Sequence, residues 1–379
     1  MLVLNNFTND IRVHKEAMSL ASEGYKVNVI ALWYPGLGVN EYHSGYNVIR
    51  LKLLSRPWQN RLLSPPIKHL EFALRVWQLA GHEPAQIYHA KDANTLPAAW
   101  LASKRNHAKL IYDSHELETG RNFPSNNVAG IYRKLWTLPE KIFIRQANSI
   151  ITVSPSIANE ISRIYHLPTP YVILNCPLLS PVQATARLRQ EFNIHEKLYI
   201  LLYQGTVSTG RGIEAFLNAV QLIKNVVGVV LGDGSALESY RNRVRSGEWE
   251  RVYLPGAVLS VDLPLYTASA DLGIALIQDN CLSHRLSLPN KLFEYLHAGL
   301  PVVCSDLPEM ARVVRNYQVG EVVDPEDPSS IANGIQSILG DPVRYARMKA
   351  NTKKAINDFN WQNESKKLIE IYESLALLK

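Results

Sequence analysis

Cysteine is scarce in this sequence, and its few copies lie far apart. The chain has 379 residues and three cysteines, Cys176, Cys281 and Cys304. They form no CxxC pair, so the sequence suggests neither a disulfide framework nor a thiolate metal site. The sequence also has no Cys/His cluster and no plausible pair of aspartates for a divalent ion. We therefore predict that no metal is required.

Long apolar runs are missing as well. No run approaches the roughly 20 residues that a membrane-spanning helix needs. The first residues, MLVLNN, lack the charged region and the long apolar core of a secretory signal. We therefore expect a cytoplasmic protein, and peripheral contact with the inner face of a membrane stays open as an addition.

Low-complexity tracts and internal repeats are absent, and the composition is not that of a disordered or fibrous protein. The composition, 46% hydrophobic and 20% charged, is that of a globular protein. A chain of this length is too long for one hydrophobic core, so we expect two domains.

Short apolar strands alternate with amphipathic helices, which is typical of parallel α/β sheets. In the first half we predict strands at 2–5, 27–32, 48–51, 87–89, 110–112 and 149–153, and helices at 11–22, 93–103 and 132–146. After a proline-containing linker at 175–181 we predict strands at 199–203, 226–231, 252–254, 272–276 and 302–305, and helices at 213–220, 237–245 and 291–298. Two doubly wound α/β domains are expected, with ligands at the carboxyl ends of their strands.

Positive charge is concentrated in the first half of the chain. Residues 1–175 contain 19 Lys and Arg against 12 Asp and Glu, whereas the remainder contains 21 against 22. The excess is compatible with an anionic membrane surface, a lipid phosphate or a polyanion as partner. A solvated surface explains it equally well. Nucleic acid is not expected, because no groove-reading motif accompanies the charge.

The segment 51–80 mixes aromatic and aliphatic residues with basic ones. Such a pattern is compatible with an amphipathic surface that contacts a membrane. A loop and a helix packed on the domain core give the same pattern, and we leave both interpretations open.

The most informative motif is LPNKLFEYLHAGLPVV at 288–303. We expect Asn290 to cap a helix that opens at Lys291, because asparagine is a favoured N-cap residue. The helix start would then offer backbone N–H groups and a positive dipole end to a diphosphate. Glu294, one turn further along, could accept two hydrogen bonds from a ribose diol. Gly299 would end the helix.

Two glycine-containing turns follow predicted strands in the second half. The first, YQGTVSTGRG at 203–212, differs from the GxGxxG fingerprint, but its glycines let a ligand approach and Arg211 can bind phosphate. A structural turn with a surface arginine is the alternative. The second turn, LGDG at 231–234, would lie near the nucleotide base, or would be an ordinary tight turn.

Polar residues also follow strands in the first half. His115 lies just beyond the predicted strand at 110–112, and Asp92 follows the strand at 87–89. We expect both to face a ligand, because the carboxyl ends of parallel strands share one edge of the sheet. Asp10 would either cap the first helix or lie at the mouth of the same site.

Taken together, these motifs resemble the family-four group of retaining glycosyltransferases with the GT-B architecture, over essentially the whole chain. The most specific match is 289–303, and 113–116, 205–212, 232–234, Asn175 and the FNW run at 359–361 are similar to other family positions. The resemblance implies two Rossmann-like domains facing across a cleft. It assigns 1–175 to the acceptor side, 176–358 to the nucleotide-sugar donor, and 359–379 to a helix that crosses back to the first domain.

The resemblance also implies the roles of single residues. It assigns catalytic roles to His115, Arg211 and Glu294. It assigns donor binding to ten residues: Gly205, Thr206, Arg211, Gly232, Asp233, Pro289, Asn290, Lys291, Leu292 and Glu294. It assigns the acceptor side to Asp10, Arg12 and Asp92. Two positions depart from the family: Leu286 stands where a first glutamate is often found, and Thr206 where an arginine is often found.

The implied reaction is metal-independent transfer of a hexose, with retention, from a UDP- or GDP-type sugar to a hydroxyl group. The acceptor would be a glycan, a glycolipid or a polysaccharide precursor, and no cofactor beyond the donor is expected. Two alternatives stay open: a nucleotide-sugar epimerase of the same architecture, and a non-catalytic subunit that binds a partner or lipid.

Overall fold

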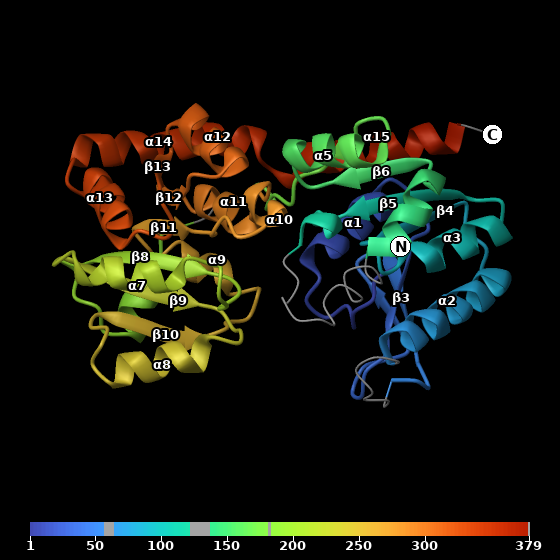
Figure 1. The fold of residues 1–379 in the computed structure, drawn as a ribbon, viewed down its shortest axis with the longest axis horizontal. Coiled ribbons are helices and arrows are strands. Elements are labelled where there is room, and N and C mark those ends of the chain that lie inside the picture. The colour runs from blue at the N-terminus through green and yellow to red at the C-terminus, as the bar shows by residue number, and fades with distance from the viewer. Residues whose placement is uncertain (57–63, 122–136, 181–182, 378–379) are drawn as a thin grey trace. The chain divides into compact units, whose positions relative to one another are not determined.

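A computed structural model describes residues 1–56, 64–121, 137–180 and 183–377 of the chain (Figure 1). The contacts divide it into two compact units. The first contains Met1–Leu174 and Glu364–Lys379, and the second contains Asn175–Asn363. In the described part of the chain, no helix is both long enough and apolar enough to cross a membrane.

The first unit is an α/β domain. In chain order its elements are α1 (Ile11–Ser22), β1 (Asn28–Leu32), β2 (Asn40–His43), β3 (Tyr46–Leu51), α2 (Ser64–His82), β4 (Ile87–Lys91), α3 (Leu96–Arg105), β5 (Lys109–Ser114), η1 (Glu118–Gly120), η2 (Ile144–Gln146), β6 (Ser149–Thr152), α5 (Pro155–Tyr165) and β7 (Tyr171–Val172). Helix α15 (Trp361–Leu377) crosses the boundary in sequence, and its residues from Glu364 onward belong to this unit.

The strands of the first unit form two groups, β1-β3-β2 and β4-β5-β6-β7. All pairs are parallel except β2 with β3. The chain start links the groups, because Leu2 forms parallel bridges to both Ile30 and Ala90. The strand predicted at 2–5 is therefore reduced to these bridges. The helix predicted at 132–146 lies partly outside the described residues.

The second unit has one parallel sheet with the order β10-β9-β8-β11-β12-β13. Its elements are α6 (Arg187–Glu191), β8 (Tyr199–Gln204), α7 (Ile213–Gln221), β9 (Val226–Leu231), α8 (Leu237–Arg245), β10 (Val252–Gly256), α9 (Leu263–Thr267), β11 (Leu272–Ala275), α10 (Leu282–Arg285), α11 (Asn290–His297), β12 (Val302–Ser305), α12 (Pro308–Tyr317), β13 (Gly320–Val323), α13 (Pro328–Leu339) and α14 (Pro342–Asp358). The strand order reverses between β8 and β11, which is the switch point where doubly wound sheets bind ligands. The predicted α/β class with doubly wound parallel sheets is confirmed.

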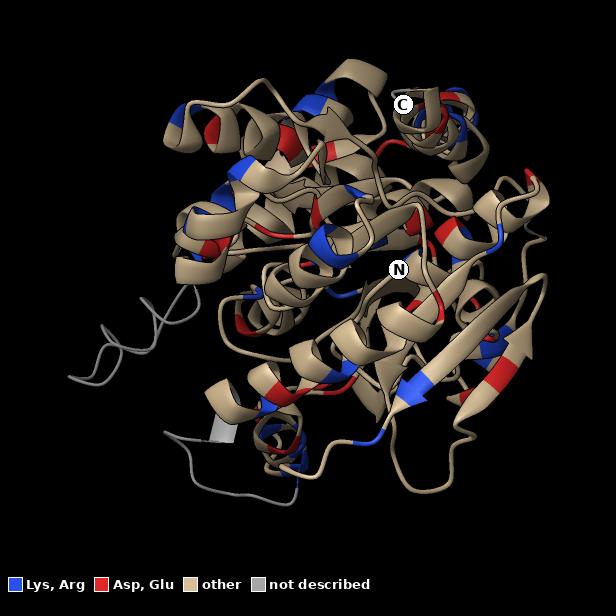
Figure 2. Ribbon diagram, turned by 90° about the vertical axis from the view of Figure 1, so that its right-hand side faces the viewer, with Lys and Arg blue, Asp and Glu red and all other residues tan. Residues whose placement is uncertain are grey.

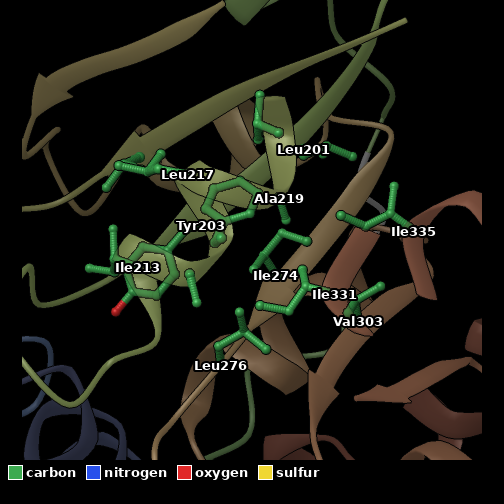
Figure 3. Close-up of a cluster of buried hydrophobic side chains, with 14 of the residues drawn as sticks. Leu201, Tyr203, Ile213, Leu217, Ala219, Ile274, Leu276, Val303, Ile331 and Ile335 are labelled. Atoms are coloured by element: carbon green, nitrogen blue, oxygen red, sulfur yellow. The ribbon is translucent and has the colours of Figure 1, made fainter. Parts of the chain in front are cut away.

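Strand β8 supplies side chains to the hydrophobic core of the second unit. Alternate residues of a strand point to opposite faces. Leu201 and Tyr203 of β8 pack with Ile213 and Leu217 of α7 and with Ile331 of α13 (Figure 3). The next residue, Gln204, is directed away from this cluster and toward α9 and α11.

Close packing of α11 on the sheet depends on a glycine. A Cβ atom at Gly273 of β11 would lie 2.3 Å from the ring of Tyr295 in α11. The missing side chain therefore leaves room for the ring. The Tyr295 hydroxyl then accepts a hydrogen bond from the Gln204 backbone N–H at 2.9 Å, which ties α11 to the end of β8.

Candidate active site

The loop after β8 lies against the turn after β9, backbone to backbone. A Cβ atom at Gly232 would lie 1.8 Å from the Gly205 carbonyl oxygen, and one at Gly234 would lie 2.3 Å from the Val207 oxygen. The Val207 N–H also donates to the Asp233 carbonyl at 2.9 Å. The glycines of the predicted LGDG turn therefore have a packing role, because any side chain there would push the two loops apart.

The end of the glycine-containing loop is held by the segment that follows β11. Gly212 has φ +65°, and a Cβ there would lie 2.6 Å from the Leu276 side chain. The Gln278 N–H donates to the Gly210 carbonyl oxygen at 2.9 Å. Arg211 is partly exposed and lies between Gly210 and Gly212, whose positions these contacts hold.

Helix α11 begins one residue earlier than expected. Asn290 is its first residue, Pro289 takes the N-cap position, and no side chain caps the helix. The capping role predicted for Asn290 is therefore wrong: proline, with its fixed φ, precedes the helix instead. The first N–H groups of an α-helix lack intrahelical acceptors, so this end of α11 still suits an anion. Gly299, with φ +74°, follows the helix end as predicted.

Lys291 lies against the start of the glycine-containing loop. Its ammonium nitrogen is 3.5 Å from the centre of the Tyr203 ring, and its Cε would lie 3.5 Å from a Cβ at Gly205. Burial and the nearby Arg211 lower the pKa of Lys291 well below its ordinary value, although Glu294 acts in the opposite direction. Two cations thus approach each other beside the loop, where a bound phosphate would stabilise both.

Glu294 lies one turn after Lys291 on α11 and is partly exposed. The Gln204 side-chain amide donates a hydrogen bond to its Oε2 atom, although the two residues are 90 positions apart. The carboxylate is thereby held near the end of β8. A carboxylate held in a fixed orientation can accept hydrogen bonds from a diol.

Leu286, which stands at the position of the family's first glutamate, is the C-cap of the short helix α10. Its N–H donates to the Leu282 carbonyl oxygen at 3.0 Å. Nearby, the Asn280 side chain approaches the glycine-containing loop, because a Cβ at Gly210 would lie 2.6 Å from its amide nitrogen. The His284 ring also approaches, since its Cε1 would lie 3.5 Å from the same Cβ, so the segment brings an amide and an imidazole to the loop.

In the first unit His115 lies just after β5, between two carboxylates. Its Nε2 is 3.3 Å from Asp113 Oδ2, its Nδ1 is 3.5 Å from Asp92 Oδ2, and its side chain is 22% exposed. The His115 backbone N–H also donates to Asp92 Oδ1 at 3.1 Å. Burial alone would lower the pKa of His115, but Asp92 and Asp113 raise it above its ordinary value. The ring is therefore fixed in place and biased toward the imidazolium form.

Arg12 has a different environment from the one predicted. Its side chain is 5% exposed, forms ion pairs with Glu16 at 2.9 Å and Asp113 at 3.2 Å, and donates to the Ile173 carbonyl oxygen at 3.0 Å. A guanidinium buried in this way cannot contact an acceptor from solvent. Its assignment to the acceptor surface is therefore corrected: Arg12 is an internal partner of Asp113, which in turn holds His115.

One group of three potential metal ligands comes together in the described part of the chain, namely Glu16, His89 and Asp113. The Lys91 ammonium lies within this group, hydrogen-bonded to Glu16 and, at 2.7 Å, to Asp113. Together with Arg12 it supplies the positive charge that an ion would bring. Arg12 and Lys91 also hold the pKa of Asp113 well below its ordinary range. The geometry is that of a buried ion-pair cluster.

Asp10 and Asp92 have defined structural roles. The Asp10 side chain accepts from the Val13 N–H and caps α1, which is one of the two roles predicted for it. Asp92 follows β4 with φ +66°, in the left-handed region that aspartate tolerates better than most residues. Its N–H donates to the Asp113 carbonyl oxygen at 2.8 Å, which keeps the Asp92 carboxylate beside His115.

Sequence reasoning missed three residues that hold the candidate donor site, namely Tyr203, Gln204 and Thr267. The available signal was their position, since Tyr203 and Gln204 directly precede the glycine-containing loop. Thr267 gave no signal, because α9 is far from the loop in sequence and meets β8 only in the fold.

Two family models match the chain. "Glycosyltransferase Family 4" matches residues 11–177, and "Glycosyl transferases group 1" matches residues 185–355. A curated relative, an uncharacterized glycosyltransferase of Methanocaldococcus jannaschii, is 23% identical over 94% of this chain and 92% of its own length. A D-inositol 3-phosphate glycosyltransferase of Xylanimonas cellulosilytica is also 23% identical, over 73% of this chain and 68% of its own.

Solved structures agree on the fold. Sucrose-phosphate synthase from Thermosynechococcus elongatus superposes with a TM-score of 0.84 at 19% identity, covering 100% of this chain and 98% of its own. Anabaena HepE, solved in complex with UDP-glucose, gives a TM-score of 0.76 at 15% identity and covers 98% of both chains. With family models matching both halves and GT-B structures matching the whole, the chain belongs to the family-four glycosyltransferases.

Proposed function

We propose that this glycosyltransferase moves a hexose from a nucleoside-diphosphate sugar onto a hydroxyl acceptor, with retention of anomeric configuration and without a metal. The second unit binds the donor, and the first unit provides the acceptor side. One observation carries the proposal: Arg211, Lys291 and Glu294 converge on the glycine-containing loop after β8. Two cations next to a helix start suit a diphosphate, and a carboxylate one turn away suits a ribose diol.

The leaving diphosphate gains negative charge in the transition state. Arg211, Lys291 and the N-terminal end of α11 would stabilise this charge, which is the role that a divalent ion has in other enzymes. The bond between the anomeric carbon and the diphosphate oxygen breaks, and a bond to the acceptor oxygen forms on the same face of the sugar. The acceptor's proton passes to an oxygen of the leaving phosphate.

His115 would hold a hydroxyl group of the donor sugar and so orient the reacting carbon. Asp113 supports this role by hydrogen-bonding the ring at Nε2, so that Nδ1, 3.5 Å from Asp92 Oδ2, is the nitrogen that would meet the sugar. Asp92 and Asp10 would contact the acceptor. Similar proteins suggest the chemistry of the substrates: Anabaena HepE was solved with UDP and with UDP-glucose, and one curated relative bears the name D-inositol 3-phosphate glycosyltransferase.

The first test is a thermal-shift screen against UDP, GDP, ADP, TDP and CMP, with and without magnesium. A ligand that binds the folded state raises its melting temperature. We expect one nucleoside diphosphate to give a selective shift that EDTA does not change. Arg211→Ala and Glu294→Ala should each reduce the shift. No shift with any nucleotide at millimolar concentration would favour a non-catalytic subunit.

The second test uses the sugar nucleotide of the selected base. Incubation without an acceptor should yield at most slow hydrolysis, and an isomerised sugar nucleotide would indicate an epimerase. With an acceptor, NMR of the product should show the same anomeric configuration as the donor. Inversion would contradict the proposed same-face route.

We also propose that α2 contacts an anionic membrane that carries the acceptor. Leu70, Leu74 and Trp77 lie on one face of this helix and are 60%, 50% and 41% exposed. Arg105 of α3 stacks on the Trp77 ring at 3.9 Å, which adds positive charge beside the apolar stripe. Figure 2 marks basic residues in blue and acidic ones in red, and both colours occur on helices that face the viewer. The part of the predicted surface at 57–63 lies outside the described residues.

Flotation with vesicles tests this contact. Binding to vesicles that contain phosphatidylglycerol, and weaker binding to pure phosphatidylcholine, is the expected result, because an apolar stripe with basic neighbours binds anionic interfaces. Leu74→Glu should reduce binding, whereas Leu259→Glu, at an exposed leucine of the second unit, should not. Equal binding by both variants and the wild type would show that Leu74 of α2 does not contact the membrane, and would contradict the proposal.

A further inference from the structure

Gln204, at the end of β8, is a buried amide with two polar contacts in opposite directions. The residue is 2% exposed. Its side-chain N–H donates to the Glu294 carboxylate on α11, and its Oε1 accepts from the Thr267 hydroxyl on α9 at 2.8 Å. A buried amide costs stability unless its groups are hydrogen-bonded, so a glutamine here needs both partners. The residue thus connects three elements at the rim of the candidate donor site.

The chemistry of these partners fixes the orientation of the amide. An ionised carboxylate only accepts hydrogen bonds, so the NH₂ end of Gln204 must face Glu294. The opposite orientation would place the amide oxygen against the carboxylate. Oε1 therefore faces Thr267, whose hydroxyl also lies 2.8 Å from the Leu263 carbonyl oxygen. Its single hydrogen serves one acceptor at a time.

The backbone of Gln204 adds a second connection to the same helix. Its N–H donates to the Tyr295 hydroxyl at 2.9 Å, and Tyr295 directly follows Glu294 in sequence. The Tyr295 ring is fixed in turn against Gly273 of β11. Gln204 therefore holds two consecutive residues of α11, one through its side chain and one through its main chain.

We propose that Gln204 is a positioning residue that orients Glu294 toward the ribose of the donor, and that Thr267 keeps the Gln204 amide in the required orientation. The inference rests on the proposed donor site. A carboxylate that accepts two hydrogen bonds from a vicinal diol needs a fixed plane. The bond from Gln204 to Oε2 restricts rotation of the carboxylate, whose two oxygens together offer about four acceptor sites.

If Gln204 positions Glu294, variants that lack either side chain should bind nucleotides with ribose and with 2′-deoxyribose about equally well. A site built to bind a hydroxyl group binds the analogue that lacks it more weakly. For the wild type we expect UDP or GDP, whichever binds, to have roughly tenfold lower Kd than its 2′-deoxy counterpart, because one hydrogen bond to a charged group is lost. Gln204→Leu should bring the ratio close to one, as Glu294→Ala should. Thr267→Val should lower the ratio partly, and Thr267→Ser should retain it.

Isothermal titration with the two ligands on one preparation measures the ratio. A misfolded fraction lowers the number of sites for both ligands equally, so a folding defect does not change the ratio of the two Kd values. Gln221→Leu is the matched control: Gln221 also makes amide hydrogen bonds, to Leu217 and Glu250 at the far end of α7, and its loss should leave the ratio at the wild-type value.

The possible outcomes separate the inference from the proposed function. If Glu294→Ala loses discrimination and Gln204→Leu keeps it, the positioning role is overturned while the donor site stands. If the wild type binds both ligands equally, Glu294 does not contact the 2′-hydroxyl and the inference is also overturned. If the wild type binds no nucleoside diphosphate, the donor site itself is contradicted.

Discussion

The two units each contain a cluster of charged side chains, and the clusters differ in how their charges are compensated. In the first unit Arg12 and Lys91 are buried, and each pairs with both Glu16 and Asp113. In the second unit Arg211 and Lys291 lie near each other, and neither forms an ion pair with an acidic residue in the parts of the chain that the structure describes.

This difference indicates different tasks. A cluster whose charges neutralise one another has no need of a ligand, and its contacts fix the orientation of neighbouring groups such as His115. A buried lysine whose pKa is lowered by burial and by a neighbouring arginine is stabilised in its charged form when an anion binds. We therefore interpret the first cluster as a rigid support for His115 and the second as an anion-binding site.

The largest expected effect comes from breaking the buried cluster. Asp113→Asn keeps the size of the side chain but removes one of the two carboxylates, Asp113 and Glu16, that both Arg12 and Lys91 contact. Removing one partner from a buried ion pair typically costs about 3–5 kcal/mol of stability. We expect a loss of this size in the first unit, measured by native-state hydrogen exchange of amides in β4 and β5, because the two units need not unfold together.

The matched control is Asp306→Asn. Asp306 pairs with Arg315 at 3.0 Å on the surface of the second unit. An exposed pair contributes about 0–1 kcal/mol. If the two substitutions destabilise the protein equally, the buried cluster does not have the structural role that its burial indicates.

The next effect concerns catalysis. His115→Ala removes the group that would orient the donor sugar, and misplacement of the reacting atoms costs roughly a hundredfold in kcat. Nucleotide affinity should stay near the wild-type value, because the donor's diphosphate and base would bind in the second unit. Turnover assays and nucleotide titrations on the same variant test this separation. A comparable loss in nucleotide affinity would contradict it.

A smaller effect is expected in the second cluster. Lys291→Met removes one of two neighbouring cations, so affinity for a nucleoside diphosphate should fall roughly tenfold, as for one lost charge-assisted hydrogen bond. The melting temperature without ligand should not fall, because a partly desolvated charge is removed. Lys349→Met is the control: Lys349 lies 5.5 Å from the Tyr345 ring, away from the loop, and should affect neither quantity.

The sequence predicted the fold well where hydrophobic patterns are strong. The strand at 199–203 corresponds to β8, and the strand at 226–231 to β9, because continuous apolar runs between turns are typical of buried parallel strands. The strand at 2–5 was wrong in extent, since only isolated bridges form there. The antiparallel strand β2 was missed, because NEYH at 40–43 is mostly exposed and carries no apolar pattern.

The sequence predicted only part of the candidate site, because residues far apart in the sequence could not be connected. Glu294 and Lys291 could be found because they share a motif with a helix start. Gln204 could not be connected to Glu294, because 90 residues separate them and only the fold brings them together. The burial of Arg12 could not be predicted either, because no sequence pattern indicates that Arg12 lies inside the domain and pairs with Asp113 rather than with a substrate.

The smallest expected effect concerns the charge of His115. Asp92→Asn removes one of the two carboxylates that raise its pKa, while the amide oxygen can still accept from the His115 N–H. The imidazole should therefore titrate at lower pH in the variant, as followed by NMR of its ring protons. Because the folded-state pKa of His115 is raised, its stabilising interaction is fully present below the unfolded value of about 6.5 and is lost as pH rises through the folded value.

The stability difference between wild type and Asp92→Asn should thus be largest in mild acid, at most about 1 kcal/mol for such a partly exposed pair, and should shrink toward alkaline pH. Glu160→Gln, which removes the partner of Arg163 at another site of the same unit, should show no such change between pH 6 and 8, because neither group titrates there. A difference that grows with pH would mean that His115 is neutral beside Asp92, and that the first cluster orients an imidazole rather than an imidazolium.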